Sequence, residues 1–281
     1  MRSFRFIGTL FLFFFLLSVG QAQKTTNGQK GGTGLRTLQH SSFQAGEVLK
    51  YHVRYGFIHA GEAVVKVKET DKKVRGRELL HMVGKGRSKG SFDWVYKVRD
   101  RYETYMDKKG VFPWIFIRRV NEDGYIIKQD YTFFQRKNKV EAEHRGTSID
   151  GVKKGTYDTP EAVQDIFSSF YYARTLDFSK AEKGQTYEIN CFLDEKLYPF
   201  QIRYLGRDTV ETSYGKFSTY RFSPVVQKGR IFKEEDDLQV WITDDGNNIP
   251  VLAKAKILVG SIKLELKHWE GLVNPISRLD E

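Results

Sequence analysis

The sequence predicts a mainly β protein, an antiparallel β-roll or barrel-like sheet with one α-helix packed on it. Three observations lead to this fold class. Apolar and polar residues alternate with a period of two along most of the chain, turn sequences such as DKKG, NEDG and RKNK separate the alternating stretches, and only residues 160–174 show helical spacing. The 281 residues suffice for one large β domain or two small ones.

The first alternating stretch is EVLKYHVRYG, in which Leu49, Tyr51 and Val53 alternate with polar residues. This is the pattern of a strand with one side in water. FIHAG then supplies a turn and EAVVKVK runs back, so residues 47–68 are predicted to form a hairpin. The same pattern predicts further strands at 98–106, 112–120, 125–135, 140–144, 187–193 and 198–205.

Near the C-terminus the phase of the alternation changes. Ala253, Ala255, Ile257 and Val259 are odd-numbered, whereas the apolar residues from Ile262 onward are even-numbered. Because a slip of one residue turns a whole strand over, the sequence predicts a β-bulge or sharp bend at Gly260.

The predicted helix lies in TPEAVQDIFSSFYYART. Thr159 would be its N-cap and Pro160 its first residue. Its apolar stripe is formed by Val163, Ile166, Phe167, Phe170 and Tyr171. The stripe should face a sheet, and the helix should plug or cap an open end of it.

The N-terminus has the features of a secretory signal. A basic MRSFRF precedes 13 apolar residues, which end in small residues at Gly20 and Ala22. A spanning helix needs about 20 apolar residues, so cleavage near Ala22 is the preferred interpretation. Residues 1–22 are predicted to be the signal peptide and residues 23–42 a disordered leader.

Charge and export together limit the partners. The formal net charge is +11, and removal of Arg2 and Arg5 with the signal leaves 11 − 2 = +9. An exported protein does not meet nucleic acid, so the remaining partners are anionic: lipid head groups, phosphorylated glycans or acidic protein surfaces. The alternative is that the lysines only solvate one face of a sheet. Cys191 is the single cysteine, so no intramolecular disulfide forms, and a buried inert thiol is predicted.

The motifs that suggest chemistry have simpler explanations. The acidic segment KEEDDLQVWITDDGNNIP lacks the alternating ligands and distant glutamate of an EF-hand, and it predicts a hairpin turn at 244–248. The six histidines show no ligand spacing, and Ser168 and Ser169 lack a nucleophile elbow. GKGRSKG, residues 84–90, predicts a flexible basic loop. No catalytic residue, metal ligand or cofactor is predicted.

One strand suggests a binding surface. VFPWIFIRRV is apolar on both faces up to Arg118 and Arg119, so it is either buried between layers or faces an apolar cavity. In the second case the two arginines could hold an anionic head group. The candidate binding residues are Trp114, Arg118, Arg119, Tyr171, Arg174 and Trp241.

Six segments of the chain resemble the DUF3108 family of exported Gram-negative proteins of unassigned function. They are FQAGEVLKYHVRYGFIHAGEAVVKV, YKVRDRYETYMD, VQDIFSSFYYART, YLGRDTVETSYGKFSTYRFSPVV, GRIFKEEDDLQVWITDDGNNIPV and AKILVGSIKLEL. The resemblance implies a periplasmic domain over residues 43–272, similar to a spiral β-roll, followed by a tail at 273–281. Two β-rich halves could meet near residues 146–158. The resemblance supplies no catalytic residue. The recurrent residues of the family have these counterparts: Gly46, Glu47, Gly61, Asp165, Ser169, Tyr171, Arg174, Gly215, Asp244 and Pro250.

The leading functional hypothesis is a non-enzymatic periplasmic protein that binds an anionic amphiphile or glycan, or a partner that handles one. The alternatives are an assembly factor that pairs a sheet edge with an envelope protein, and a glycan or cell-wall hydrolase. The hydrolase requires convergence among five acids: Glu62, Asp100, Asp165, Glu195 and Asp244. The sequence leaves the oligomeric state open.

Overall fold

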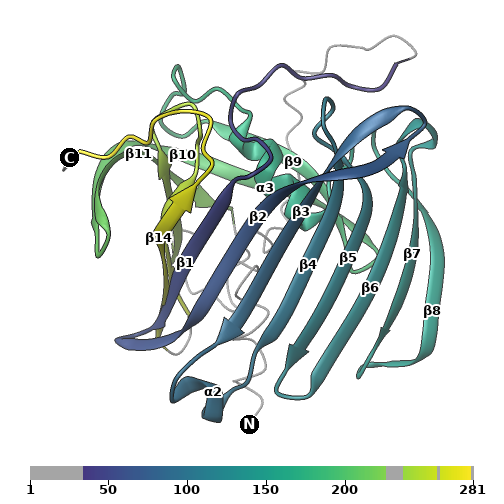
Figure 1. The fold of residues 1–281 in the computed structure, drawn as a ribbon, viewed down its shortest axis with the longest axis horizontal. Helices are drawn as coiled ribbons and strands as arrows, with labels where there is room; N and C mark the ends of the chain where they lie inside the picture. The colour runs from purple at the N-terminus through teal and green to yellow at the C-terminus, as the bar shows by residue number, and fades with distance from the viewer. Residues whose placement is uncertain (1–33, 226–236, 258–259, 280–281) are drawn as a thin grey trace.

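The computed structural model describes residues 34–225, 237–257 and 260–279. The predicted signal peptide, most of the leader and residues 226–236 lie outside this part of the chain. Within the described residues, fourteen antiparallel strands form one sheet in the order β8-β7-β6-β5-β4-β3-β2-β1-β14-β13-β12-β11-β10-β9 (Figure 1). The strands are β1 Val48–Tyr55, β2 Ile58–Val74, β3 Arg77–Ser88, β4 Arg99–Asp107, β5 Pro113–Glu122, β6 Tyr125–Phe134, β7 Lys139–Gly146, β8 Ile149–Asp158, β9 Thr186–Leu193, β10 Lys196–Thr212, β11 Gly215–Pro224, β12 Leu238–Thr243, β13 Pro250–Lys256 and β14 Ser261–Glu270. The helices are α2 Phe92–Val95, the 3-10 turn η2 Gln135–Lys137 and α3 Ile166–Arg174.

The strand order follows the chain in two runs. β1 to β8 form one meander and β9 to β14 form another, and β1 pairs with β14 to join them. The sheet is not closed, because β8 and β9 stand at its two ends and do not pair with each other. The fold is therefore the predicted antiparallel, barrel-like sheet. Residues 146–158 include the edge strand β8, where the first run ends, and one continuous sheet contains both runs.

The predicted alternation is seen in the strands. In β1, Leu49, Tyr51 and Val53 are buried on the inner face, whereas His52 and Arg54 lie on the outer face and are half-buried. Each strand turns one set of side chains inward because successive side chains point to opposite faces. The curled sheet encloses these inward residues, and they form the main hydrophobic core.

The helix α3 begins later than predicted. Its N-cap is Asp165, whose carboxylate accepts hydrogen bonds from the backbone N–H groups of Phe167 and Ser168, both at 2.7 Å. Thr159 is not the N-cap, because Gln164 pairs with β9: its N–H donates to Asn190 and its C=O accepts from Phe192. A residue that bonds to a neighbouring strand in this way cannot also start a helical turn.

Helix α3 lies inside the curl of the sheet and contacts both β4 and β9 (Figure 1). Polar residues on it, such as Ser168 and Ser169, are therefore buried together with the apolar stripe. The close approach needs Gly84 on β3, where an added Cβ would lie 3.1 Å from the Phe167 ring. The prediction of a loop at GKGRSKG was wrong for its first five residues, which belong to β3. Among the described residues, no helix has the length and hydrophobicity to cross a bilayer.

The change of phase at Gly260 has a different cause from the predicted bulge. β13 ends at Lys256 and β14 begins at Ser261, and these two strands pair antiparallel. Gly260 takes a left-handed φ of 85° in the connection between them. The predicted long bent strand is thus a hairpin, and each of its strands keeps its own phase.

Both ends of the described chain pack against the sheet. Arg36, in the predicted disordered leader, donates to the carbonyl groups of Gly110 and Val111 at 2.9 and 2.7 Å. In the predicted tail, the Ser277 N–H donates to Asp245 at 2.8 Å. Residues 34–42 are therefore an extended, hydrogen-bonded segment in the structure, and they differ from the predicted disorder.

Candidate ligand-binding site

A row of polar side chains crosses the inner face of five strands. Cross-strand pairs join Tyr102 on β4 to Arg118 on β5, Arg118 to Gln129 on β6, Gln129 to His144 on β7, and His144 to Lys153 on β8. We call these five residues the inner polar row. Except for Lys153, its members occupy the same phase as core residues and are buried. Buried polar groups at four consecutive register positions are unusual in a sheet interior.

The β9–β10 turn supplies the anions that face this row. Asp194 and Glu195 form the turn with φ of 47° and 58°, the left-handed conformation of a two-residue hairpin turn. The Asp194 carboxylate accepts from Arg118 at 3.1 Å and from the Gln129 side chain at 2.8 Å. This turn belongs to the second run of strands and docks on the inner face of the first run.

Glu195 binds the far end of the row. Its carboxylate accepts from Lys153 at 3.2 Å and from the Tyr131 hydroxyl at 3.3 Å. The Nδ1 atom of His144 lies 3.3 Å from the same carboxylate. The Glu195 side chain is buried, whereas that of Asp194 is 44% exposed. The exposed Asp194 carboxylate is therefore easier for water or another anion to replace than the buried Glu195 carboxylate.

Arg118 is charged although its side chain is only 2% exposed. Burial acts to lower its pKa, but Tyr102 and Asp194 outweigh this effect and raise the pKa above its ordinary value. Its Nε atom and the Nε2 atom of His144 are buried without a hydrogen-bond partner in the described part of the chain. Buried polar atoms without a hydrogen-bond partner are rare and indicate a strained or ligand-binding position.

A second acidic group lies close to the row. Asp100 on β4 is buried, and its carboxylate accepts from the Asn121 N–H at 3.2 Å. Burial and the nearby Glu122 raise the pKa of Asp100 to about 8. Asp100 is therefore mostly protonated at neutral pH and adds little negative charge beside Arg118.

Tyr171 and Arg174 lie together and both bind the buried Glu47 carboxylate. The Arg174 guanidinium donates to both Glu47 carboxylate oxygens at 2.7 Å, and the Tyr171 hydroxyl donates to the same carboxylate at 3.3 Å. Asn248 also donates to the Arg174 carbonyl at the end of α3. These contacts join the helix to Glu47, which directly precedes β1, and to the 244–248 turn, which forms as predicted, and they indicate a structural role.

The other candidate residues do not meet at one site. Arg118 and Arg119 follow each other on a strand and so point to opposite faces; Arg119 lies outside and pairs with Asp130 at 2.6 Å. The two arginines therefore cannot hold one head group together. Trp114 and Trp241 are buried, and each indole N–H donates to a carboxylate: Trp114 to Asp107 at 3.1 Å and Trp241 to Asp208 at 2.9 Å.

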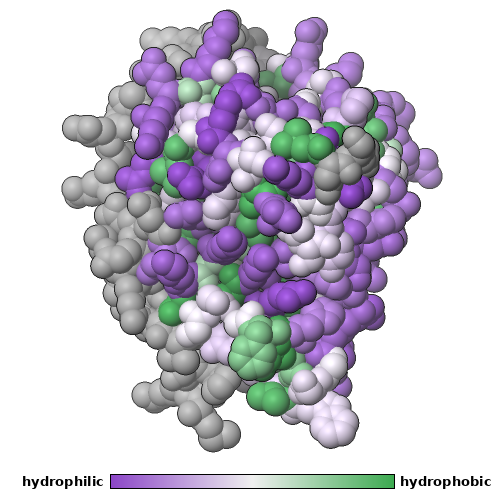
Figure 2. Space-filling view, turned by 90° about the vertical axis from the view of Figure 1, so that its left-hand side faces the viewer, coloured by the Kyte–Doolittle hydropathy of each residue, from purple (hydrophilic) through white to green (hydrophobic). Residues whose placement is uncertain are grey.

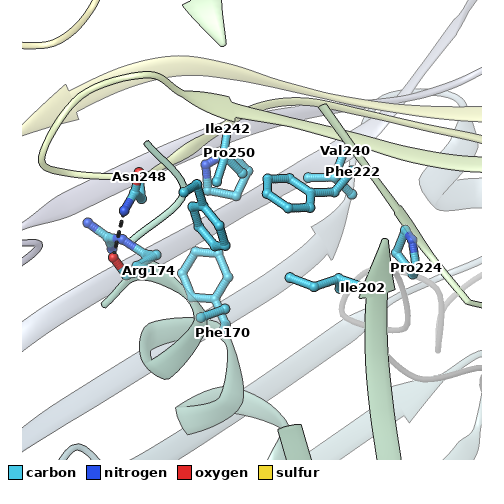
Figure 3. Close-up of a pocket in the computed structure, with 11 residues that line it drawn as sticks. Phe170, Arg174, Ile202, Phe222, Pro224, Val240, Ile242, Asn248 and Pro250 are labelled. Carbon is cyan, nitrogen blue, oxygen red and sulfur yellow. Dashed lines mark hydrogen bonds between the residues drawn. The ribbon is translucent and has the colours of Figure 1, made fainter. Parts of the chain in front are cut away.

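An apolar cavity of about 40 Å³ lies between α3 and the second run of strands (Figure 3). Phe170, Ile202, Phe222 and Val240 point into it, and Arg174 with its hydrogen-bonded partner stands at one side. Sites for small organic ligands usually measure about 300–1,000 Å³. This cavity is therefore too small for an amphiphile in the observed arrangement.

A larger and more polar hollow, of about 360 Å³, lies between the β2–β3 turn and the β4–β5 turn. It is lined by Lys73, Gly76, Arg77, Glu78, Asp107 and Lys109. Arg77 is ion-paired with Asp107 there. Cationic side chains outnumber carboxylates among the lining residues, but no buried donor in this hollow is left without a partner.

The five acids named for a hydrolase have separate partners. Glu62 binds Lys267, Asp100 binds the Asn121 N–H, Asp165 caps α3, Glu195 binds the inner polar row, and Asp244 binds Arg207. None of these contacts joins two of the five.

The comparisons with known proteins support the fold. A family model described as "Protein of unknown function (DUF3108)" matches residues 50–267. The chain belongs to the DUF3108 family. This DUF3108 chain is also similar to a solved structure from Brucella abortus, described as a β-barrel-like protein of domain of unknown function DUF1849. The TM-score is 0.51 at 12% identity, and the match covers 82% of this chain and 98% of that chain. Such a likeness shows the fold alone. No curated protein matches the sequence.

Sequence reasoning identified Arg118 but missed the rest of the inner polar row. The signal was present in the phase of each strand: Gln129 alternates in step with Ile127 and Tyr131, and His144 in step with Ala142. A polar residue in the apolar phase of a strand predicts a buried polar group. Which of these groups become neighbours depends on register, and the sequence pattern alone does not determine it.

Proposed function

We propose that this DUF3108 protein is a non-enzymatic periplasmic protein that binds an anionic amphiphile or glycan through the inner polar row. The observation that carries the proposal is Arg118, a buried, charged guanidinium with an unpartnered Nε atom. Its counter-ion, Asp194, is half exposed on a turn and makes one contact with it. A ligand carboxylate, phosphate or sulfate could take the place of that carboxylate and use the same donors.

The dimensions of the row favour an extended polar ligand. Five neighbouring strands about 4.8 Å apart span roughly 19 Å from Tyr102 to Lys153. Sugar hydroxyls or a head group with several polar atoms can use donors spaced along such a distance. The apolar part of an amphiphile would lie against α3, and the 40 Å³ cavity would have to widen to hold it. Binding therefore requires the β9–β10 turn to move away from the row.

The test compares two neighbouring arginines on β5. Arg118→Gln removes the inner charge, and Arg119→Gln is the matched control because its side chain lies on the outer face. The proteins are produced with export in a Gram-negative host and studied by native mass spectrometry and on lipid and glycan arrays. We expect a retained or salt-sensitive anionic ligand in the parent and the control, and its loss in Arg118→Gln. Absence of any ligand from the parent, or equal binding by both variants, would refute the proposal.

One observation favours the alternative of an assembly factor. Strand β8 is an edge of the sheet, and residues 150–155 on it are largely exposed. An edge strand can accept a strand from another protein. The lysines at 153 and 154 oppose uncontrolled pairing, so a partner strand would need acidic side chains. Crosslinking in the native envelope that yields a stoichiometric protein partner and no small ligand would favour this alternative.

A further inference from the structure

Exposed hydrophobic side chains gather at one end of the molecule. Of the eight large hydrophobic residues that are exposed in the described part of the chain, four lie at or next to two connections: Phe57 in the β1–β2 turn with Ile58 at the start of β2, and Trp94 and Val95 on α2. Phe57 is 92% exposed and Trp94 is 94% exposed. Aromatic side chains usually bury most of their surface, so two almost fully exposed rings at one end of the molecule indicate an interaction site.

The two connections are side by side and fixed to each other. The Lys89 N–H before α2 donates to the Ala60 carbonyl at the start of β2, at 3.0 Å. Beneath the exposed rings, Tyr55 and the buried Phe92 have ring centroids 6.3 Å apart. The two exposed aromatic side chains therefore project from a supported base, and we name Phe57, Ile58, Trp94 and Val95 the aromatic tip.

A basic surface adjoins the aromatic tip. On the outer face of β14, β1, β2 and β3, and beside α2, six cationic side chains share three carboxylates. The cations are Arg54, Arg87, Lys89, Arg99, Lys263 and Lys267; the acids are Glu62, Asp93 and Glu265. Figure 2 shows the molecule from the side on which β14 lies in Figure 1: hydrophilic residues cover much of this face, and several hydrophobic residues lie at its lower end. The surface thus has three surplus positive charges next to an apolar end.

We propose that the aromatic tip docks this protein on an anionic phospholipid surface. Phe57 and Trp94 enter the interfacial layer, where aromatic rings are favoured in membrane proteins. The neighbouring cations then lie within reach of the head groups, and each contributes to binding when the lipids are anionic. This docking places the protein on a bilayer without a spanning segment, and it does not depend on the inner polar row.

Charge distinguishes a lipid surface from a second copy of this chain. Two copies joined through the aromatic tip would bring their two basic surfaces, each with three surplus positive charges, close together. Like charges across an interface oppose association. An anionic bilayer instead neutralises the basic surface while the aromatic rings leave water. Electrostatic attraction and burial of apolar surface therefore both favour binding to the bilayer.

The test uses sedimentation with vesicles. The mature protein is mixed with vesicles of phosphatidylcholine alone or of phosphatidylcholine with phosphatidylglycerol, at low and high salt. We expect binding to the anionic vesicles that weakens with salt. The double variant Phe57→Ser/Trp94→Ser should bind at least about tenfold more weakly, because burial of each ring contributes a factor of this order. The control Val152→Ser/Leu197→Ser changes two hydrophobic residues that are exposed outside the tip and should bind like the parent.

Several outcomes would overturn the proposal. They are equal vesicle binding by the double variant and the parent, no binding by the parent, and a parent dimer in light scattering that the double variant lacks. Because all four positions are exposed, each variant should keep the parent melting temperature. The ligand retained in native mass spectrometry should also be unchanged in Phe57→Ser/Trp94→Ser, so failure of this proposal can be told apart from failure of the proposed function.

Discussion

The buried ion pair between Arg174 and Glu47 gives the sharpest prediction about stability. In the structure the Arg174 guanidinium makes four hydrogen bonds: two to Glu47 at 2.7 Å, one to the Ser42 carbonyl at 2.7 Å and one to the Asn247 carbonyl at 2.9 Å. Glu47 is fully buried. Burial acts to lower the pKa of Arg174, but the Glu47 carboxylate outweighs it and raises that pKa. Arg174 is therefore charged in the folded protein and pairs with the Glu47 carboxylate.

The variant Arg174→Met keeps the aliphatic volume and removes the charge. Glu47 then remains buried without its partner, which destabilises proteins by about 3–5 kcal/mol. The control Arg119→Met breaks an exposed pair with Asp130 and should change stability by less than about 1 kcal/mol. The double variant Arg174→Met/Glu47→Gln should recover part of the loss, because no buried charge is left alone.

The measurement is urea unfolding, followed by tryptophan fluorescence and by circular dichroism. The reasoning predicts a large fall in the unfolding midpoint for Arg174→Met, a small one for Arg119→Met and an intermediate one for the double variant. A loss for Arg174→Met no larger than that of the control would refute the structural role of the pair. In that case the earlier hypothesis that Arg174 is a ligand-binding residue would be strengthened.

Three further predictions concern single positions. Burial first, and then Glu122, raise the pKa of Asp100 from 3.8 to about 8, so the folded state binds the proton of this acid more tightly than the unfolded state does. The resulting contribution to the free energy of unfolding is complete below pH 3.8 and is lost as pH rises through 8. Asp100→Asn removes the titrating group and should flatten the decline in stability between pH 5 and 8, measured by urea unfolding. Gly146→Ala places a Cβ 2.2 Å from the Ile126 carbonyl oxygen and should cost about 1–3 kcal/mol, seen as a lower melting temperature. Asp165→Ala removes the N-cap of α3 and should cost about 1–2 kcal/mol in the same assay.

Most strands could be predicted because the alternation of apolar and polar residues is a local property. The prediction failed where a local pattern has two structural outcomes. The change of phase at Gly260 is compatible with a bulge or with a hairpin, and only the pairing of β13 with β14 decides between them. Glycines at 84 and 86 resemble a loop, yet both belong to β3, and Gly84 makes room for the Phe167 ring of α3.

The helix start could not be predicted for a related reason. Pro160 after Thr159 is a strong local signal for a helix N-terminus. Asp165 followed by Ser168 is a second signal of the same kind, six residues later. The tertiary pairing of Gln164 with β9 selects the second one, and a sequence pattern carries no information about that pairing.

The candidate site follows from the topology more than from any motif. β8 and β9 are the two ends of the sheet, and the segment that connects them along the chain contains α3. When α3 packs against both β4 and β9, it carries the β9–β10 turn over the inner face of the first run. The donors of the inner polar row and the carboxylates of that turn therefore meet only when the sheet curls. Because a buried Arg118 needs a counter-ion, the sheet must curl and bring Asp194 to Arg118 in the same folding step. A ligand whose own anionic group pairs with Arg118 would release Asp194 and the β9–β10 turn, and the charge of Arg118 would stay neutralised. The β9–β10 turn, rather than the inner polar row, is therefore the part of the site that must move.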